Sequence, residues 1–274
     1  MDFDKNSWCI LSPIEQSIKR KIEAVGVPLK DWNISINYGI KTGCNEAFII
    51  DGATKDALIA QDPKSAEIIR PILRGRDIKR YSYEFADKWL IATHNGTATQ
   101  ERINIEDYPA VKMHLDSYYA KIAKREDQGD TPYNLRCCAY WDDFSKQKIV
   151  WARLMRISKS DLTDFPRFSL VSEEMFPIDS LCFFTGEDLE YLKSILNSSF
   201  AIYWFFNNIA ILDNGGMQMR QQYIEKFPIP KIALDKYTEV SDDKILELFD
   251  FSDKEVDFIK KQIDDNFKKI IGKE

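Results

Sequence analysis

Short extended segments alternate with polar, glycine and proline residues over much of residues 32–184, whereas helical periodicity dominates the remainder of the chain. Apolar, β-branched and aromatic residues form these extended runs, which cover about residues 33–37, 47–50, 89–93, 149–153, 168–171 and 180–184. Turn-forming residues separate them. A mixed β-rich region followed by helices predicts an α+β fold.

Helices are expected at both ends of the chain and between the strands. Ser12 and Glu15 form a capping box before an apolar stripe that ends near Gly26. Further helices are expected over residues 54–73 (one or two short helices), 108–125, 185–204, 242–249 and 252–271. Thr185 is the expected cap of the helix from residue 185. Residues 214–216 predict a tight turn, and residues 227–230, Phe-Pro-Ile-Pro, predict an extended link.

Composition indicates a packed cytoplasmic protein. Hydrophobic residues make up 44% and aromatic residues 13% of the 274 residues. The most apolar run, residues 200–212, is interrupted by Asn207 and Asn208 and is shorter than a membrane span, so no membrane partner is expected. The five cysteines form no CxxC pair, and the two histidines share no ligand-like spacing with them. We therefore expect free thiols and no metal site.

The net charge of −6 argues weakly against nucleic-acid binding, but the basic residues are unevenly distributed. Residues 64–80 contain six lysines and arginines against two acids, and residues 146–167 contain the same numbers. An acidic protein with two such segments can still present a positive groove to phosphate. On composition alone, two solvated surface segments are the slightly favoured explanation of the charge pattern.

Sequence signatures of catalysis are missing. The eleven glycines form neither a GxGxxG nor a GxxxxGK[ST] loop, and the chain has no Asp/Asn-Pro-Pro-aromatic tetrapeptide of the amino-methyltransferases. Residues 77–79, Asp-Ile-Lys, match half of a metal-dependent nuclease site, but no partner acid can be identified. We therefore expect a binding module with no catalytic residue, and a nuclease that uses Asp77 is a weaker alternative.

A strand, a glycine-bounded turn and a second strand are expected over residues 36–50, with Lys41, Thr42 and Asn45 in the exposed loop. This stretch resembles the opening of the TaqI-like C-terminal specificity domain of type IIG restriction–modification enzymes and adenine-specific DNA methyltransferases. The resemblance continues in order through residues 65–81, which contain Arg-Gly-Arg, and through residues 89–91, 108–111, 148–151, 191–198, 215–220 and 227–230.

The resemblance implies a target-recognition domain that binds double-stranded DNA for a parent enzyme. The parent is expected to be a site-specific adenine methyltransferase, and the sequence leaves open whether it also cleaves DNA. The methyltransferase domain of the same parent chain, with its S-adenosylmethionine, would lie outside this segment, which we expect to hold no cofactor. The resemblance divides the chain into a connector helix (1–30), the target-recognition domain (31–232) and a C-terminal helical segment (233–274).

DNA contacts are assigned by residue chemistry, because guanidinium and ammonium groups bind phosphate and also read guanine. The expected backbone contacts are Lys41, Thr42, Asn45, Arg74, Arg76, Lys79, Arg80, Gln218 and Arg220. The expected base contacts lie where the sequence leaves the family pattern, at Arg136, Arg153, Arg156 and Lys159. For each residue an ordinary role stays open: an ion pair with Glu67, Asp77 or Glu84, a turn, or a solvated surface position.

Clustered aromatic residues at 200–206 could suggest a base-stacking platform, but such clusters on a helix more often form the core. We expect a core role for them and for Trp32, Trp89, Trp141 and Trp151. A protein-interaction module is the main rival to DNA recognition, since the C-terminal tail is acidic and the aromatic content is high.

Overall fold

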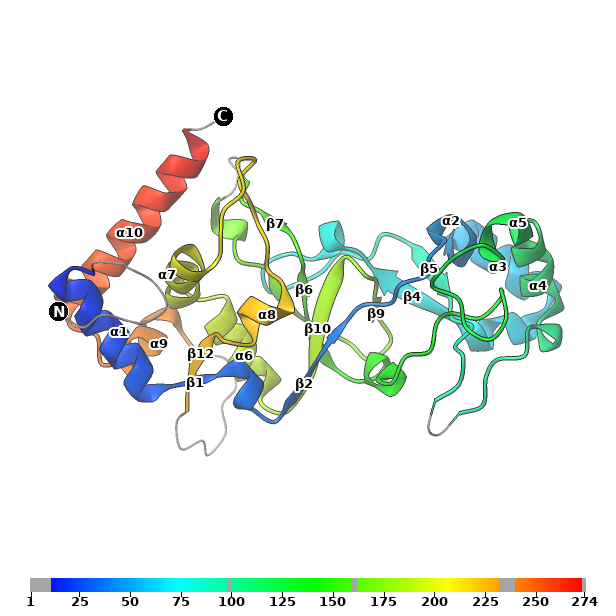
Figure 1. Ribbon diagram of the computed structural model, residues 1–274, viewed down its shortest axis with the longest axis horizontal. Helices are drawn as coiled ribbons and strands as arrows, with labels where there is room; N and C mark the ends of the chain where they lie inside the picture. Colours follow the sequence, from blue (N-terminus) through cyan, green and yellow to red (C-terminus); the bar gives the residue numbers. More distant parts are fainter. Residues whose placement is uncertain (1–10, 98–99, 159–161, 232–239, 273–274) are drawn as a thin grey trace. The chain divides into compact units, whose positions relative to one another are not determined.

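The computed structural model describes residues 11–97, 100–158, 162–231 and 240–272, and it has the mixed helices and strands of an α+β protein (Figure 1). Contacts group the chain into two compact units. Unit 1 comprises Met1–Ile34, Met155–Pro166 and Glu187–Glu274, and unit 2 comprises Ser35–Leu154 and Arg167–Gly186. These units follow packing, whereas the expected three-part division concerns function and stays a prediction. None of the helices in the described ranges combines the length and the apolar composition of a bilayer-crossing helix.

Unit 1 is mainly helical. α1 (Pro13–Val25) begins with the predicted capping box of Ser12 and Glu15. β1 (Gly26–Pro28) pairs antiparallel with β12 (Pro228–Pro230), so the Pro-Ile-Pro link is a strand that closes the unit beside α1. The other named elements of unit 1 are β7 (Met155–Arg156), α6 (Leu189–Leu196), α7 (Ser199–Asn208), β11 (Gly216–Met217), α8 (Gln221–Ile224), α9 (Asp242–Leu248) and α10 (Asp253–Ile271).

Aromatic residues of α7 form the core of unit 1, as predicted. Phe200 and Phe205 are fully buried. The ring centroid of Phe200 lies 4.1 Å from that of Phe249, and that of Phe206 lies 5.2 Å from that of Phe267 on α10. These side chains stabilise the packing of the helices of unit 1.

Unit 2 contains two four-stranded sheets. The first has the order β2-β10-β6-β8, formed by β2 (Ile34–Tyr38), β10 (Leu181–Gly186), β6 (Lys148–Ala152) and β8 (Phe168–Val171). The second has the order β3-β5-β4-β9, formed by β3 (Ile49–Asp51), β5 (Lys88–Ile91), β4 (Ile69–Leu73) and β9 (Phe176–Pro177). Figure 1 shows the helices of this unit grouped around the β3–β5–β4 part of the second sheet; they are α2 (Asn45–Phe48), α3 (Gly52–Gln61), α4 (Pro109–Asp116) and α5 (Tyr119–Ile122).

The strands of the first sheet were predicted correctly from the sequence, but part of the second sheet was predicted wrongly. Residues 69–73, expected to be helical, form β4. Pro71 does not prevent this, because β9 pairs with β4 only from Ile72 onward, directly after the proline. Residues 47–48, expected to be extended, belong to the single helical turn α2.

Two expected helices are also shorter than the apolar periodicity indicated. The segment 108–125 is divided into α4 and α5. Thr185 lies within β10 rather than at a helix cap, and Asp188 is the residue that precedes α6. The expected helix over 185–204 is interrupted after Leu196, where the Ser198 side chain accepts a hydrogen bond from the Ala201 amide and caps α7.

A buried cation lies in the first sheet of unit 2. Lys148 of β6 is fully buried, and its Nζ donates hydrogen bonds to the carbonyl oxygens of Ser172 (2.9 Å) and Met175 (3.2 Å). These bonds hold the turn between β8 and β9. Burial penalises the ammonium form and lowers the pKa of Lys148 to about 8.

We predict that Lys148→Met weakens the pH dependence of stability. From pH about 8 to the unperturbed pKa of 10.5, the unfolded chain retains a proton on Lys148 that the folded chain has released. The free energy of unfolding therefore rises with pH in this window, by about 2–3 kcal/mol more in the wild type than in Lys148→Met. Urea denaturation across this pH range measures both slopes, and equal slopes would contradict the burial of the charged group.

Candidate nucleic-acid interface

Residues 177–181 of unit 2, referred to below as the 177–181 strap, connect three loops that carry predicted DNA contacts. The Pro177 carbonyl accepts from the Ile40 amide (2.8 Å), and the Asp179 amide donates to the Ile40 carbonyl (2.9 Å), directly before Lys41. It also forms bonds from Gly39 N to Leu181 O (3.0 Å), from Ile178 N to Leu73 O (3.1 Å), from Gly75 N to Ser180 Oγ (3.2 Å) and from Arg153 N to Ser180 O (3.0 Å). The segments 39–41, 73–75 and 153 therefore converge although they are far apart in sequence.

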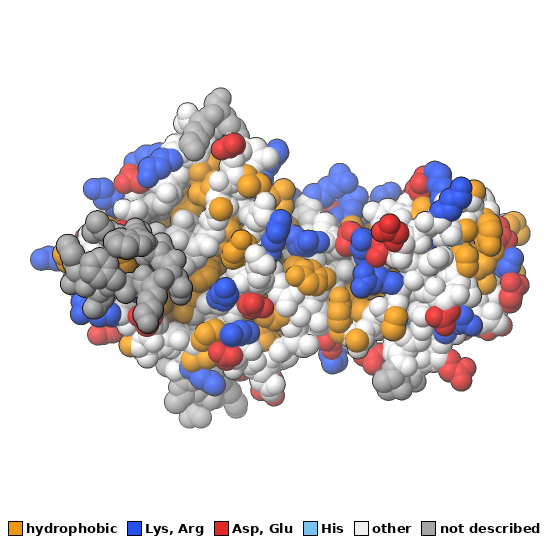
Figure 2. Space-filling model, viewed as in Figure 1, with side chains coloured by type: hydrophobic (Ala, Val, Ile, Leu, Met, Phe, Trp, Pro, Cys, Tyr) orange, Lys and Arg blue, Asp and Glu red, His pale blue; other side chains and the backbone are white. Residues whose placement is uncertain are grey.

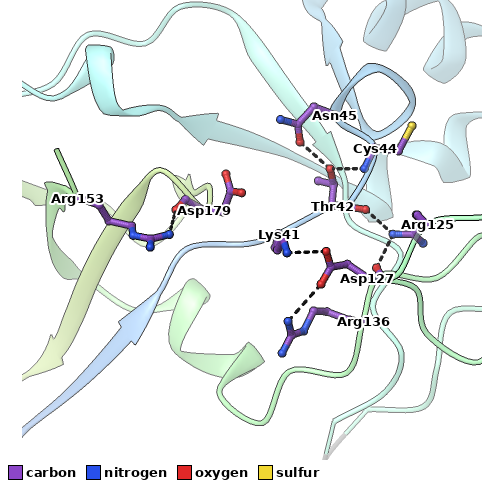
Figure 3. A network of polar contacts seen from close by, with 9 residues as sticks. All are labelled: Lys41, Thr42, Cys44, Asn45, Arg125, Asp127, Arg136, Arg153 and Asp179. Carbon is purple, nitrogen blue, oxygen red and sulfur yellow. Dashed lines mark hydrogen bonds and ion pairs between the residues drawn. The ribbon is translucent and has the colours of Figure 1, made fainter. Parts of the chain in front are cut away.

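A carboxylate flanked by two exposed cations lies beside the first of these loops (Figure 3). Asp127 pairs with Lys41 at 2.8 Å and with Arg136 at 3.3 Å. The hydrogen bond from Lys41, and then the weaker one from Arg136, lowers the pKa of Asp127. The Lys41 and Arg136 side chains are 54% and 59% exposed, whereas that of Asp127 is 15% exposed. The acid thus holds two cations at the surface, and the trio, called the Lys41–Arg136 cluster below, keeps a net positive charge.

Arg125 supports this cluster from the protein interior. Its role was not predicted from the sequence. Its guanidinium is buried and donates to the carbonyl oxygens of Thr42, Asp127 (2.8 Å), Pro132 (3.1 Å) and Asn134. It also lies 4.4 Å from the centroid of the Phe48 ring. Burial lowers the pKa of Arg125 to about 10, which still leaves it protonated at neutral pH. One side chain therefore fixes both loops that present Lys41 and Arg136.

The Thr42 hydroxyl has a local role in the turn. Thr42 is buried, its Oγ1 donates to Asn45 Oδ1 (2.6 Å), and it accepts from the Cys44 amide (3.2 Å). Gly43 adopts a φ of +68°, a left-handed conformation that glycine accepts without strain. Asn45 itself is exposed. Thus Thr42 shapes the loop, while Lys41 and Asn45 are accessible to a partner.

The Arg-Gly-Arg segment separates its two arginines into different environments. Arg74 donates from Nε and Nη2 to the two oxygens of Asp77, both at 2.9 Å, and its backbone amide donates to the same carboxylate at 2.8 Å. Asp77 is 4% exposed, and its hydrogen bonds raise the pKa of Arg74. Arg76 is exposed, and among the described residues it makes no hydrogen bond or ion pair. Hence Arg74 stabilises the turn and Arg76 faces solvent.

Asp77 and Lys79, the half-motif of a nuclease site at residues 77–79, each pair with another side chain. Both carboxylate oxygens are bound by the Arg74 side chain. Lys79, the basic residue of that half-motif, pairs instead with Glu84 at 3.5 Å. Within the described ranges, no group of three or more His, Cys, Asp or Glu residues is arranged to hold a metal ion. Neighbouring Arg80 lies over the Tyr81 ring at 5.1 Å.

The predicted base contacts occupy several places. Arg153 follows β6, is exposed, donates to the Asp179 carbonyl at 3.0 Å and lies 5.4 Å from the Tyr38 ring centroid (Figure 3). In unit 1, Arg156 is exposed on β7 opposite Gly216 of β11. Lys159 lies outside the described residues. Figure 2 shows lysine and arginine side chains over the β6 and β9 regions of unit 2, mixed with apolar and acidic ones.

The last two predicted backbone contacts belong to unit 1. Gln218 is half-buried after β11, and Arg220 is exposed at the N-cap of α8. With only four residues, α8 is a single turn, so no strong helix dipole supports phosphate binding there.

The comparison with protein families gives one match. The model of the TaqI-like C-terminal specificity domain matches residues 70–229, which is more than half of the chain and includes Arg76, Arg136 and Arg153. The match begins after the loop that carries Lys41.

Known relatives are larger than this chain. The type II methyltransferase M.PaeR7I of Pseudomonas aeruginosa is 20% identical over 231 residues, which cover 82% of this chain and 37% of the methyltransferase. The crystal structure of the type IIG restriction endonuclease BpuSI matches 96% of this chain and 33% of its own, with a TM-score of 0.52 and 14% identity, which shows a shared fold. The chain therefore spans little more than a third of the methyltransferase and a third of the endonuclease.

We predict effects of very different size on stability for the two arginines of the Arg-Gly-Arg segment. Arg74→Ala leaves the Asp77 carboxylate buried without its partner and lowers the free energy of unfolding by about 2–4 kcal/mol. Arg76→Ala removes an exposed side chain and changes it by less than about 0.5 kcal/mol. Thermal and urea denaturation measure both variants, and equal effects would refute the assignment of Arg74 to the turn.

Proposed function

Since the chain belongs to the TaqI-like C-terminal specificity domain family, we propose that it recognises a short sequence of double-stranded DNA and holds the duplex against a catalytic domain of a larger enzyme. The observation that carries this proposal is the convergence of exposed cations around the 177–181 strap. Lys41, Arg136 and Arg153 come from three separate parts of the chain, and hydrogen bonds of the strap and of Arg125 position their loops.

The charge distribution supports DNA as the partner despite the net charge of −6. Association with a duplex depends on local rather than total charge, because screening limits the reach of distant acids to about 8–10 Å at moderate salt. Asp127 is already neutralised by two cations, so the Lys41–Arg136 cluster attracts phosphate rather than repelling it. Guanidinium groups at such a surface bind phosphate or the guanine edge by paired hydrogen bonds.

We further propose a division between residues that position the duplex and residues that read its bases. The direct backbone contacts in this proposal are Lys41, Asn45, Arg76, Lys79, Arg80, Gln218 and Arg220. The base contacts are Arg136, Arg153, Arg156 and Lys159. Exposure favours Lys41, Asn45, Arg76, Arg136 and Arg153 as direct contacts in unit 2, whereas Thr42 and Arg74 act by shaping their turns.

The parent enzyme in this proposal is an adenine-specific DNA methyltransferase that binds S-adenosylmethionine in a domain outside this segment. This chain is similar to part of M.PaeR7I, and the remainder of that methyltransferase has no counterpart in this chain, which supports such a parent. The target base would be flipped into that domain, so this segment would contribute register and selectivity rather than chemistry. Residues 31–232 would form the recognition domain, with residues 1–30 connecting it and residues 233–274 forming a helical appendage.

We predict that the chain binds duplex DNA with a steep salt dependence and that Lys41→Ala reduces it. Each lost phosphate contact lowers the slope of log affinity against log salt by about 0.9. Fluorescence anisotropy of a labelled mixed-sequence duplex, repeated at several salt concentrations, gives the slope. Lys244→Ala is the matched control, since Lys244 in α9 has a similarly exposed side chain, 58% against 54%, and also pairs with an acid.

An unchanged slope in Lys41→Ala, or a change equal to that in Lys244→Ala, would contradict the proposed interface. Absence of duplex binding by the wild type at low salt would contradict the function and favour the protein-interaction alternative.

A further inference from the structure

Gly75 stands between the two arginines of the Arg-Gly-Arg segment without a folding reason to be glycine. Its φ lies outside the left-handed region. A Cβ at this position would have its nearest neighbours at ordinary contact distances, 3.6 Å from Ala152 Cβ and 3.7 Å from Ser180 Oγ. By contrast, a Cβ on Gly39 would lie 2.0 Å from the Ile178 carbonyl oxygen. Gly39 is thus required by the fold, whereas Gly75 is not.

The backbone around Gly75 is nevertheless held firmly. The Gly75 amide donates to Ser180 Oγ of the 177–181 strap at 3.2 Å. On either side, Arg74 and Asp77 close the turn through three hydrogen bonds to one buried carboxylate. A glycine loses more conformational entropy on folding than any other residue. At position 75 neither the backbone conformation nor the packing requires a glycine that would justify this loss.

Arg76 directly follows this bare stretch of backbone. It is exposed, and within the part of the chain that the structure describes it makes no hydrogen bond or ion pair. Arg74 cannot take its place, because Asp77 binds the Arg74 guanidinium on two of its nitrogens. Gly75 is half-buried beside Ala152 and Ser180. The turn therefore offers a partner a partly exposed backbone without a side chain, followed at once by an available guanidinium.

We propose that the sugar–phosphate backbone of the DNA passes in van der Waals contact with Gly75 and that Arg76 binds a phosphate of that strand. The inference rests on the proposed function and deepens it, because it assigns a contact point to the turn. Glycine permits the close approach of a partner to the protein backbone, and a methyl group would occupy the space of the phosphate oxygens. Arginine pairs with phosphate through two parallel hydrogen bonds.

Gly75→Ala is the decisive variant. A glycine that the fold requires predicts a loss of stability, whereas a glycine that the DNA requires predicts a loss of affinity at unchanged stability. Alanine reduces the conformational freedom of the unfolded chain, so the melting temperature of Gly75→Ala stays the same or rises. Its affinity for a mixed-sequence duplex falls about tenfold or more, since the duplex has to move away. Gly39→Ala is the contrasting control and lowers the melting temperature.

The double variant Gly75→Ala/Arg76→Ala tests whether the two residues meet the same phosphate. Residues that share one partner are coupled, so the combined loss of affinity is smaller than the product of the two single losses. Arg76→Ala alone also lowers the salt slope by about 0.9 at unchanged melting temperature.

Three results would overturn the inference: Gly75→Ala binding the duplex as tightly as the wild type, a loss of stability in Gly75→Ala that accounts for its weaker binding, or multiplicative effects of the two changes. Each of them leaves the proposed function intact as long as the wild type binds and Lys41→Ala lowers the salt slope. Wild type that binds no duplex at low salt removes both the function and the inference.

Discussion

The backbone hydrogen bonds of residues 177–181 are the interaction on which the candidate interface depends. Five residues of the strap hold the Lys41 loop, the Arg-Gly-Arg turn and the end of β6 in one neighbourhood of unit 2. All of these bonds except the one from the Gly75 amide to Ser180 Oγ join main-chain groups, so they fix loop positions without using the side chains that a partner would contact. Arg125 extends the same principle with a side chain, because its guanidinium binds only backbone carbonyls and leaves Lys41 and Arg136 exposed.

Acidic residues position the basic side chains of this region. Asp77 and Asp127 each bind an arginine that is a predicted DNA contact. The first is buried and consumes one guanidinium to build a turn, whereas the second lies near the surface and orients two cations outward. Counting charges along the sequence therefore overestimates the cations available to DNA at Arg74 and does not capture the arrangement around Asp127.

Local patterns predicted much of the fold. The capping box at Ser12, the strands of the first sheet of unit 2 and the core role of Phe200 and Phe205 follow from short-range periodicity and capping chemistry. β4 was missed because Pro71 and neighbouring apolar residues resemble a broken helix until β5 and β9 supply the pairing partners. Tertiary contacts of this kind override local propensity.

The candidate site was predictable in its residues but not in its arrangement. Basic residues beside glycine turns could be selected from the sequence, and most of them in unit 2 are at the surface. Arg125 could not be selected in this way, since it lies in the charged stretch of residues 124–127, which has the composition of a solvated surface. Its burial depends on carbonyl groups from two loops, the loop of Thr42 and residues 127–134, and no spacing within the sequence encodes that contact.

Selection of bound duplexes from a randomised library shows whether this chain reads DNA sequence, as the proposed function requires. The full chain, incubated with the library at moderate salt and washed, is expected to enrich a short shared sequence over successive rounds. Arg153→Ala is expected to relax one position of that sequence and keep the others. Binding of duplexes without any enriched sequence, in the wild type as in the variant, would contradict the account and leave only a non-specific electrostatic surface.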